Sequence, residues 1–220
     1  MTVIFDLDGT LIDSAPDIQA AANTVLSEAG ARPIDLAEAR SFIGEGAPVF
    51  VSRMMTATGL GDDPALHAAL LERFLSLYDT AVVLTRPFPG VAEALEALRS
   101  RGWRLGICTN KPAGLARAVL AHLGLAPFFD VVVGGDSLPE RKPHPAPLLQ
   151  TMKSLSATRC LYVGDSEIDA ACAHAARLPF AIFTEGYRKT PVESLPHDYR
   201  FSDFAALPDI AEVALRAAAE

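Results

Sequence analysis

Two aspartates stand one residue apart, directly after an apolar run near the start of the chain, in the stretch VIFDLDGTLIDS. Carboxylates that share a buried site repel each other and disfavour each other's charged form. Such a pair costs stability unless a proton or a cation balances the charge. Asp6 and Asp8 therefore constrain the fold strongly, because the chain must place them beside a positive partner.

Composition excludes several classes of function. Half of the 220 residues are hydrophobic, which is enough for a substantial core. The net charge of −8, without a run of basic residues, argues against nucleic acid or an acidic membrane surface as a partner. Cys108, Cys160 and Cys172 form no CxxC pair and are odd in number, so we expect a reducing, cytoplasmic location. Neither a signal peptide nor an apolar run of membrane-spanning length is evident.

The hydrophobic pattern changes along the chain. From about residue 14 to residue 81 it is helical, and Ser14 with Asp17 is expected to form a capping box. From Phe88 onward, apolar runs such as WRLGIC, DVVV, CLYVG and FAIF alternate with helical segments, which is typical of a parallel sheet. We predict an α/β fold with a doubly wound, Rossmann-like parallel-sheet core (1–13 and 82–220) and an inserted all-helical domain (14–81). The segment RPFPG, residues 86–90, is expected to return the chain to the core.

Polar side chains follow four of the expected strands. In a parallel sheet, ligands bind beyond the carboxyl ends of the strands, so these side chains are expected to meet. They are Asp6, Asp8 and Thr10 after the first strand, Thr109, Asn110 and Lys111 after WRLGIC, Lys142 after DVVV, and Asp165 and Asp169 after CLYV. Carboxylate oxygens suit Mg²⁺, while threonine, asparagine and lysine donate to phosphate oxygens. The pattern indicates a site for a hard cation and a phosphoryl group.

Each of these features also has a simpler interpretation. DLDGT is not an EF-hand calcium loop, because Thr10 and Leu11 stand where that loop needs a ligand and a glycine. Asp165 and Thr109 also fit helix N-caps, and Lys142 alone fits a solvated loop lysine. None of the five histidines has the spacing of metal ligands. The joint placement of these side chains at strand ends is what favours the functional interpretation.

The chain resembles the haloacid dehalogenase superfamily. Four stretches carry the resemblance in the order usual for that family: VIFDLDGTLIDS, CTNKP, GGDSLPERKPHP and YVGDSEIDA. The helical insertion is similar to the C1 cap of the superfamily. More narrowly, DSAPD, FIGEGAPVFVSRMM, TNKP and RKPHPAPLL resemble its bacterial phosphoglycolate phosphatase branch. The resemblance implies Mg²⁺-dependent hydrolysis of a small phosphorylated metabolite, with 2-phosphoglycolate as the expected substrate.

The resemblance also implies roles for the acidic residues. Asp6 would attack phosphorus, forming an aspartyl phosphate, and would also bind Mg²⁺. Asp8 would offer its backbone carbonyl to the metal, while its side chain would protonate the leaving oxygen and later deprotonate water. Asp165 would complete the protein ligands of the metal, and Asp169 would orient the waters of the metal. Thr109 and Lys142 would stabilise charge on the phosphoryl oxygens.

Substrate contacts are expected from both sides of the site. Thr10 and Asn110 are predicted to bind the substrate from the core. On the cap, FIGEGAPVFVSRMM places Gly44 and Gly46 in a loop before a helix that carries Arg53. The backbone amides of this loop and the Arg53 guanidinium are predicted to balance the carboxylate of a doubly anionic substrate, although a solvated arginine fits equally well.

Several other functions stay open at this stage or are disfavoured. A pyrophosphatase, a sugar-phosphate phosphatase and a phosphomutase of the same family would all keep these core residues. A dehalogenase would lack the second carboxylate, so Asp8 argues against that activity, and both aspartates argue against a noncatalytic phosphate-binding protein. A phosphonate hydrolase would need a cap lysine, but residues 14–81 contain none. Both a monomer and a homodimer are compatible with the sequence.

Overall fold

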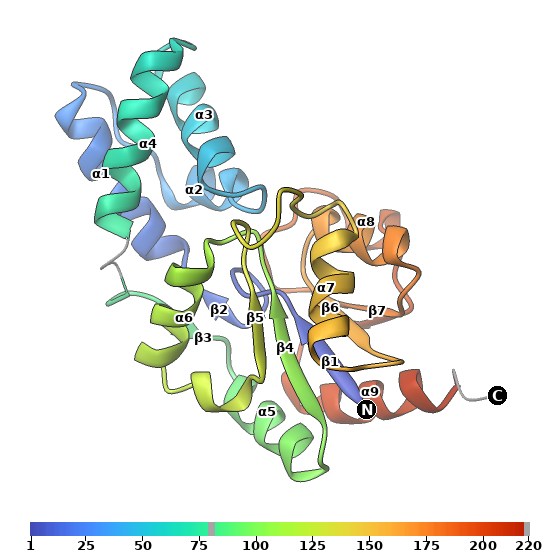
Figure 1. Cartoon of the computed structure of the whole chain (residues 1–220). Coiled ribbons are helices and arrows are strands. Elements are labelled where there is room, and N and C mark those ends of the chain that lie inside the picture. Colours follow the sequence, from blue (N-terminus) through green and yellow to red (C-terminus); the bar gives the residue numbers. More distant parts are fainter. Residues whose placement is uncertain (79–81, 218–220) are drawn as a thin grey trace.

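The central element of the computed structural model is a sheet of six parallel strands (Figure 1), and the structure describes residues 1–78 and 82–217. In spatial order the strands are β5 (Val131–Val133), β4 (Arg104–Cys108), β1 (Thr2–Phe5), β6 (Leu161–Gly164), β7 (Phe180–Phe183) and β8 (Tyr199–Phe201). All five pairings between neighbours are parallel. The first strand of the chain thus lies in the middle of the sheet, between β4 and β6.

Helices cover both faces of this sheet, as the strand composition requires. Successive residues of β1 point to opposite faces: Val3 and Phe5 join one apolar cluster, and Ile4 joins the other. The first cluster is covered by α5 (Val91–Ser100), α6 (Ala113–His122) and α9 (Leu207–Ala217). The second is covered by α7 (Ala146–Ser154) and α8 (Glu167–Ala176). Short helical turns are η1 (Ala126–Phe128), η2 (Val192–Ser194) and η3 (Phe204–Ala206). The predicted doubly wound α/β class is confirmed.

Four helices, which precede α5 in the chain, stand beyond the carboxyl ends of the strands (Figure 1). They are α1 (Ala15–Glu28), α2 (Leu36–Phe42), α3 (Ala47–Thr58) and α4 (Pro64–Tyr78). We call them the cap helices. Their apolar side chains form a separate cluster to which the core contributes Leu115 of α6. At its base, β2 (Ile12–Asp13) pairs antiparallel with β3 (Arg86–Pro87). The domain division at residues 13 and 81 stays a prediction, and its second boundary falls at residues 79–81, outside the described residues.

The capping box predicted at Ser14 and Asp17 is wrong. Ser14 is the N-cap residue of α1, but its side chain makes no capping bond within the described chain. Its hydroxyl instead donates to Asp8 Oδ1 at 2.5 Å. The carboxylate of Asp17 accepts hydrogen bonds from the backbone of Leu84 and Thr85 and from the Thr85 hydroxyl. Both side chains therefore form hydrogen bonds with residues outside the helix. Those of Asp17 connect α1 to the returning chain at Leu84 and Thr85. Capping boxes form at α2 and α8.

No helix in the described ranges combines the length and the apolar character that crossing a membrane requires.

Removing the Asp17 carboxylate should destabilise the protein. In Asp17→Ala, the buried Thr85 hydroxyl and two backbone N–H groups lose their acceptor. Buried donors left unpaired cost roughly 1–3 kcal/mol each, so we expect the free energy of unfolding in urea to fall by about 3 kcal/mol. Asp62→Ala, at an exposed site, is the matched control and should change it by less than about 0.5 kcal/mol. Equal effects of both substitutions would contradict this role.

Candidate active site

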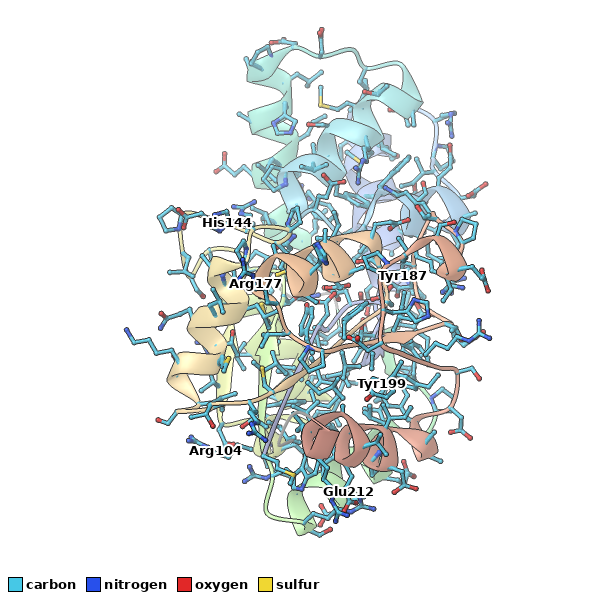
Figure 2. The ribbon with its side chains drawn as sticks, turned by 90° about the vertical axis from the view of Figure 1, so that its right-hand side faces the viewer. Arg104, His144, Arg177, Tyr187, Tyr199 and Glu212 are labelled. Carbon is cyan, nitrogen blue, oxygen red and sulfur yellow. The ribbon has the colours of Figure 1, made fainter. Side chains whose placement is uncertain are left out.

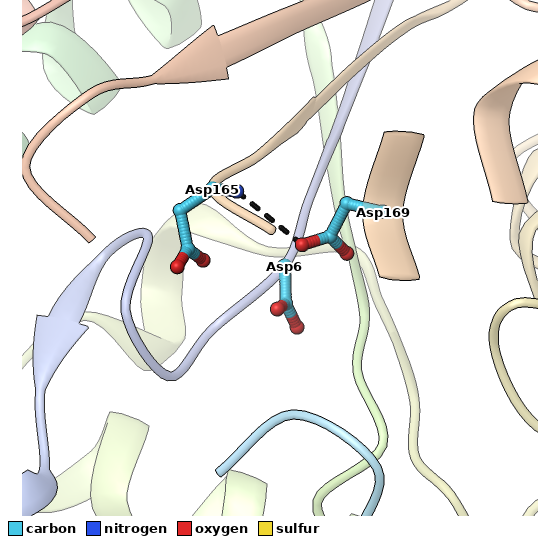
Figure 3. Close-up of side chains that lie close together, drawn as sticks. All are labelled: Asp6, Asp165 and Asp169. Atoms are coloured by element: carbon cyan, nitrogen blue, oxygen red, sulfur yellow. Dashed lines mark hydrogen bonds between the residues drawn. The ribbon is translucent and has the colours of Figure 1, made fainter. Parts of the chain in front are cut away.

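The ends of four neighbouring strands bring the predicted core residues together. Asp6 follows β1, Thr109 follows β4, Lys142 lies in the loop after β5, and Asp165 follows β6. These strands are adjacent in the order β5-β4-β1-β6, so their ends share one edge of the sheet. Asp169, in the first turn of α8, completes a group in which one oxygen each of Asp6, Asp165 and Asp169 lie within 4.8 Å of one another (Figure 3). The sequence predicted this convergence.

Lys142 is the positive partner of this carboxylate group. Its Nζ lies 2.6 Å from Asp169 Oδ1, 2.8 Å from Asp6 Oδ1 and 3.0 Å from the Tyr162 hydroxyl, and its side chain is only 2% exposed. Burial by itself lowers the pKa of this lysine, but the charges of Asp169 and Asp6 outweigh burial and raise the pKa well above its usual range. The ammonium therefore stays charged inside the protein.

Asp169 has its oxygens occupied by protein donors. Oδ1 accepts from Lys142 and from the Tyr162 hydroxyl at 2.7 Å. Oδ2 accepts from the Ser166 hydroxyl at 2.6 Å and from the backbone N–H groups of Ser166 and Asp165, the last bond being drawn in Figure 3. Although burial opposes ionisation, the Lys142 charge and these bonds lower the pKa of Asp169. Asp169 is therefore held as a carboxylate whose lone pairs are already in use.

Asp6 has fewer hydrogen-bond donors around it than Asp169. Its Oδ1 lies 2.8 Å from Lys142 Nζ, an ammonium that also donates to Asp169 and Tyr162. Burial raises the pKa of Asp6 to about 7, the Lys142 charge lowers it, the Asp169 charge raises it, and hydrogen bonds with Lys142 and Leu7 lower it. A buried carboxylate that shares its ammonium with a second carboxylate is a costly arrangement that a further cation can relieve.

Asp165 lies on the other side of Asp6 in a tightly built pocket. Its Oδ1 accepts from the Thr10 hydroxyl, and its Oδ2 accepts from the Tyr187 backbone N–H, both at 2.7 Å. A Cβ at Gly186 would lie 2.3 Å from Asp165 Oδ2, and one at Gly9, where φ is +87°, would lie 2.6 Å from it. Glycine is therefore required at both positions. Burial, and then the Asp169 charge, raise the pKa of Asp165 well above its usual range.

The charges of this group leave room for a cation. Asp6, Asp165 and Asp169 face one ammonium, and the raised pKa values of Asp6 and Asp165 indicate that all three ionise together only with a further positive charge beside them. Carboxylate oxygens of Asp6 and Asp165 are hard donors of the kind that Mg²⁺ prefers. The residues present therefore fit a divalent metal ion.

Asp8 points toward a second lysine. Its Oδ1 accepts from the Ser14 hydroxyl and lies 3.0 Å from Lys111 Nζ. The lysine side chain is 4% exposed, and its ammonium also donates to the Tyr78 hydroxyl of α4 and lies 4.3 Å from the centre of that ring. The sequence placed Lys111 after its strand but gave it no role. Tyr78 was not anticipated at all, because a tyrosine at the end of an amphipathic helix resembles core packing.

Two of the predicted substrate-binding residues are engaged by the protein. Thr10 donates to Asp165. The Asn110 amide donates to the carbonyls of Gly44 and Lys142, and its oxygen accepts from the Lys142 N–H. Asn110 thereby joins the loop between α2 and α3 (residues 43–46), which we call the cap loop, to the loop that carries Lys142. Contact of either side chain with substrate stays a prediction.

Two hollows meet at Asp6 and Asp8, and both are also lined by Ile43 and Gly44 of the cap loop. The first, which we call the apolar hollow, lies between the cap helices and the core. Its walls include Ile18, Phe50, Phe74, Tyr78, Thr109 and Lys111. The second, the polar hollow, is lined by Glu45, Asp165, Ser166, Glu167, Tyr187 and Lys189. Gly46 lines the apolar hollow, so the predicted glycine loop does face the site.

Arg53 is engaged by the cap loop. Its guanidinium pairs with Glu45 and donates to the Phe42 carbonyl at 3.1 Å. Arg53 is absent from the described lining residues of both hollows, although its partner Glu45 lines the polar hollow. Contact of Arg53 with substrate stays a prediction.

Tyr187 links the cap side of the site to the metal side, and the sequence gave no spacing signal for it. Figure 2 shows this residue where the helical insertion meets the core. Its hydroxyl donates to Asp13 and accepts from the N–H of Ala15 at 3.1 Å, while its own N–H holds Asp165. Arg40 of α2 pairs with Asp13 at 2.9 Å. One side chain thus contacts the start of the insertion and positions a carboxylate of the site.

Phosphoryl transfer is the chemistry that such a set of groups serves, and the enzyme is a phosphatase. The chain belongs to the haloacid dehalogenase-like hydrolase family, whose model matches residues 3–183. It is 52% identical over 209 residues to a phosphoglycolate phosphatase of Cereibacter sphaeroides, covering 94% of this chain and 96% of the relative. It is 49% identical to the phosphoglycolate phosphatase of Rhodobacter capsulatus, covering 96% of both chains.

A solved structure agrees with the fold. The crystal structure described as a predicted phosphoglycolate phosphatase from Haemophilus somnus superposes with a TM-score of 0.90 at 31% identity. The match covers 95% of this chain and 96% of that chain, so it includes the cap helices as well as the sheet.

Replacing Asp165 should stabilise the metal-free protein and abolish its response to Mg²⁺. In Asp165→Asn, the amide oxygen still accepts from Tyr187 N–H and the NH₂ group donates to Thr10, whose hydroxyl turns to accept. Because the pKa of Asp165 is raised in the folded state, this carboxyl group lowers stability as the pH rises through that pKa. With a chelator at mildly alkaline pH, we expect a higher melting temperature than in wild type.

Mg²⁺ supplies the second half of this test. Mg²⁺ at a hundredfold excess over its Kd should stabilise wild type by about 2.7 kcal/mol, and the variant by much less. A variant that is less stable in chelator, or that keeps the full response to Mg²⁺, would contradict the charge assignment.

Proposed function

We propose that this enzyme hydrolyses a small phosphate monoester, with 2-phosphoglycolate as its substrate, Mg²⁺ as its cofactor and Asp6 as its nucleophile. The observation that carries the proposal is the buried Asp6 carboxyl group, which lies beside Asp165 and shares the Lys142 ammonium with Asp169. The names of the two relatives near 50% identity support the choice of substrate. The three cysteines are free and buried, which supports the proposed cytoplasmic location.

In the first step, an oxygen of Asp6 attacks phosphorus while the bond from phosphorus to the ester oxygen breaks. Asp8 gives its proton to that oxygen, so glycolate leaves as an alcohol and Asp6 carries the phosphoryl group. Lys142 and the Thr109 hydroxyl face the phosphoryl oxygens and offset their negative charge. The hollows on both sides give the substrate its approach to Asp6.

In the second step, water attacks the phosphoryl group on Asp6. Asp8, now a carboxylate, takes a proton from the water, and the bond between phosphorus and Asp6 breaks to release inorganic phosphate. Lys111 and Ser14 hold the Asp8 side chain in place for both proton transfers. One side chain thus serves as acid and then as base, which returns the enzyme to its starting state.

Asp6, Asp165 and the backbone carbonyl of Asp8 would hold the Mg²⁺ ion, and Asp169 would orient its waters. The ion would supply positive charge that polarises the phosphoryl oxygens. Lys142 keeps Asp169 ionised, and Asp169 accepts a hydrogen bond from the backbone N–H of Asp165. Thr10 and Tyr187 fix the orientation of Asp165 from two sides.

The test is phosphate release from a panel of esters, measured with Mg²⁺ and with a chelator. We expect 2-phosphoglycolate to give the highest kcat/KM among 2-phosphoglycolate, pyrophosphate and small sugar phosphates, and a chelator to abolish turnover. Asp6→Asn, which keeps the shape of the side chain, should lower kcat by about 10⁴-fold or more, because an amide cannot attack phosphorus.

Three outcomes would count against the proposal. Turnover by Asp6→Asn within about tenfold of wild type would remove the nucleophile assignment. Preference for pyrophosphate or for a sugar phosphate would contradict the proposed substrate, but not the proposed hydrolysis through Asp6. Transfer of the phosphoryl group between two positions of a phosphosugar, without release of phosphate, would indicate a mutase.

A further inference from the structure

We infer that Lys111 binds the carboxylate of the leaving group, and that the enzyme therefore selects phosphate esters of short 2-hydroxy acids. The inference rests on the proposed function and adds the residue and the chemical class that set its specificity. It assigns to a core lysine the role that the sequence had suggested for Arg53.

Lys111 is the cation that lines the apolar hollow. Among the described lining residues, the others are acidic, polar without charge, or apolar, with Ile18, Phe50 and Phe74 on the cap side. The ammonium uses one proton for Asp8 and one for Tyr78. An ammonium has three protons, and the third has no partner among the described residues. A buried donor with a free proton in an apolar wall is a site for an anionic acceptor.

The proposed reaction strengthens this argument through charge. Asp8 is the acidic residue whose side chain pairs with Lys111. In the proposed first step Asp8 is the neutral acid that protonates the leaving oxygen, so it does not balance the ammonium. Asp6, the other acidic residue in the lining, is then engaged with phosphorus and with Lys142. A substrate carboxylate restores the balance at this stage, whereas a neutral leaving group leaves a buried positive charge uncompensated.

Distance limits where that carboxylate can be attached. Lys111 Nζ is 3.0 Å from the Asp8 oxygen, and Asp8 must reach the ester oxygen to protonate it. A carboxylate that accepts from the same ammonium therefore lies on the Asp8 side of the ester oxygen. A carboxylate bonded to the carbon that bears the ester oxygen, as in 2-phosphoglycolate and 2-phospholactate, satisfies this condition.

The experiment compares two leaving groups of similar size in wild type and in Lys111→Met. The probes are 2-phosphoglycolate and 2-hydroxyethyl phosphate, which replaces the carboxylate with a neutral alcohol. We expect the variant to lose about 30-fold or more in kcat/KM for 2-phosphoglycolate, mostly through KM, because a charge-assisted contact present in both ground and transition states is lost. For the neutral ester the loss in kcat/KM should be at least about tenfold smaller, because it reflects only the weaker hold on Asp8.

The matched control is Lys153→Met, which removes the same charge from an exposed site in α7. It should leave kcat/KM unchanged for both esters. Melting curves check folding, and Lys111→Gln, whose amide can still donate to Asp8, replaces Lys111→Met if that variant unfolds. Equal losses on both esters would overturn the inference, because Lys111 would then act only through Asp8.

The outcomes separate this inference from the proposed function. If wild type hydrolyses 2-phosphoglycolate well and the variant loses both esters equally, the function stands and the role of Lys111 falls. If wild type hydrolyses the neutral ester with the same kcat/KM as 2-phosphoglycolate, the enzyme does not select its substrate by the carboxylate, although it is a phosphatase. If wild type releases phosphate from neither ester, the proposed substrate itself is wrong.

Discussion

The ion pairs of Lys142 are the interaction on which the rest of the site depends. This ammonium lies between Asp169 and Asp6, and all three groups are withdrawn from water. Removing any one charge from such a group would leave the others uncompensated. The two carboxylates differ in their other partners: Asp169 also accepts from Tyr162 and Ser166, whereas Asp6 lies beside Lys142 with no other side-chain donor among the described residues. One side chain thus separates a supporting carboxylate from a reactive one.

The parallel sheet explains why such a group can exist at all. Asp6 and Asp165 follow β1 and β6, which are buried on both faces and fix the positions of the residues after them. The cap helices then close the edge of the sheet, and their contribution differs between the two hollows. The apolar hollow receives Phe50 and Phe74, whereas the polar hollow receives Glu45. Phosphoryl chemistry and recognition of the leaving group are therefore assigned to different elements that meet at Asp8.

Sequence alone predicted the sheet, the helical insertion and the meeting of Asp6 with Lys142, because strand composition and strand ends obey local rules. It failed where a side chain had competing long-range partners. Ser14 was expected to accept a hydrogen bond at the start of a helix, but its hydroxyl instead donates to Asp8 in the folded chain. Arg53 lies two turns into its helix as expected, and the sequence did not indicate its ion pair with Glu45. Tyr187 could not be found, because its role depends on contacts between residues more than 150 positions apart in sequence.

A double-mutant cycle on Lys142 and Asp169 tests the central claim most directly, with the free energy of unfolding in urea and chelator as the measurement. Lys142→Met alone should cost about 3–5 kcal/mol, because it leaves buried carboxylates without a counter-charge. Adding Asp169→Asn should recover part of that loss, giving a coupling of about 2 kcal/mol or more. Additive effects within about 0.5 kcal/mol would show that the two side chains contribute independently, and would contradict the account.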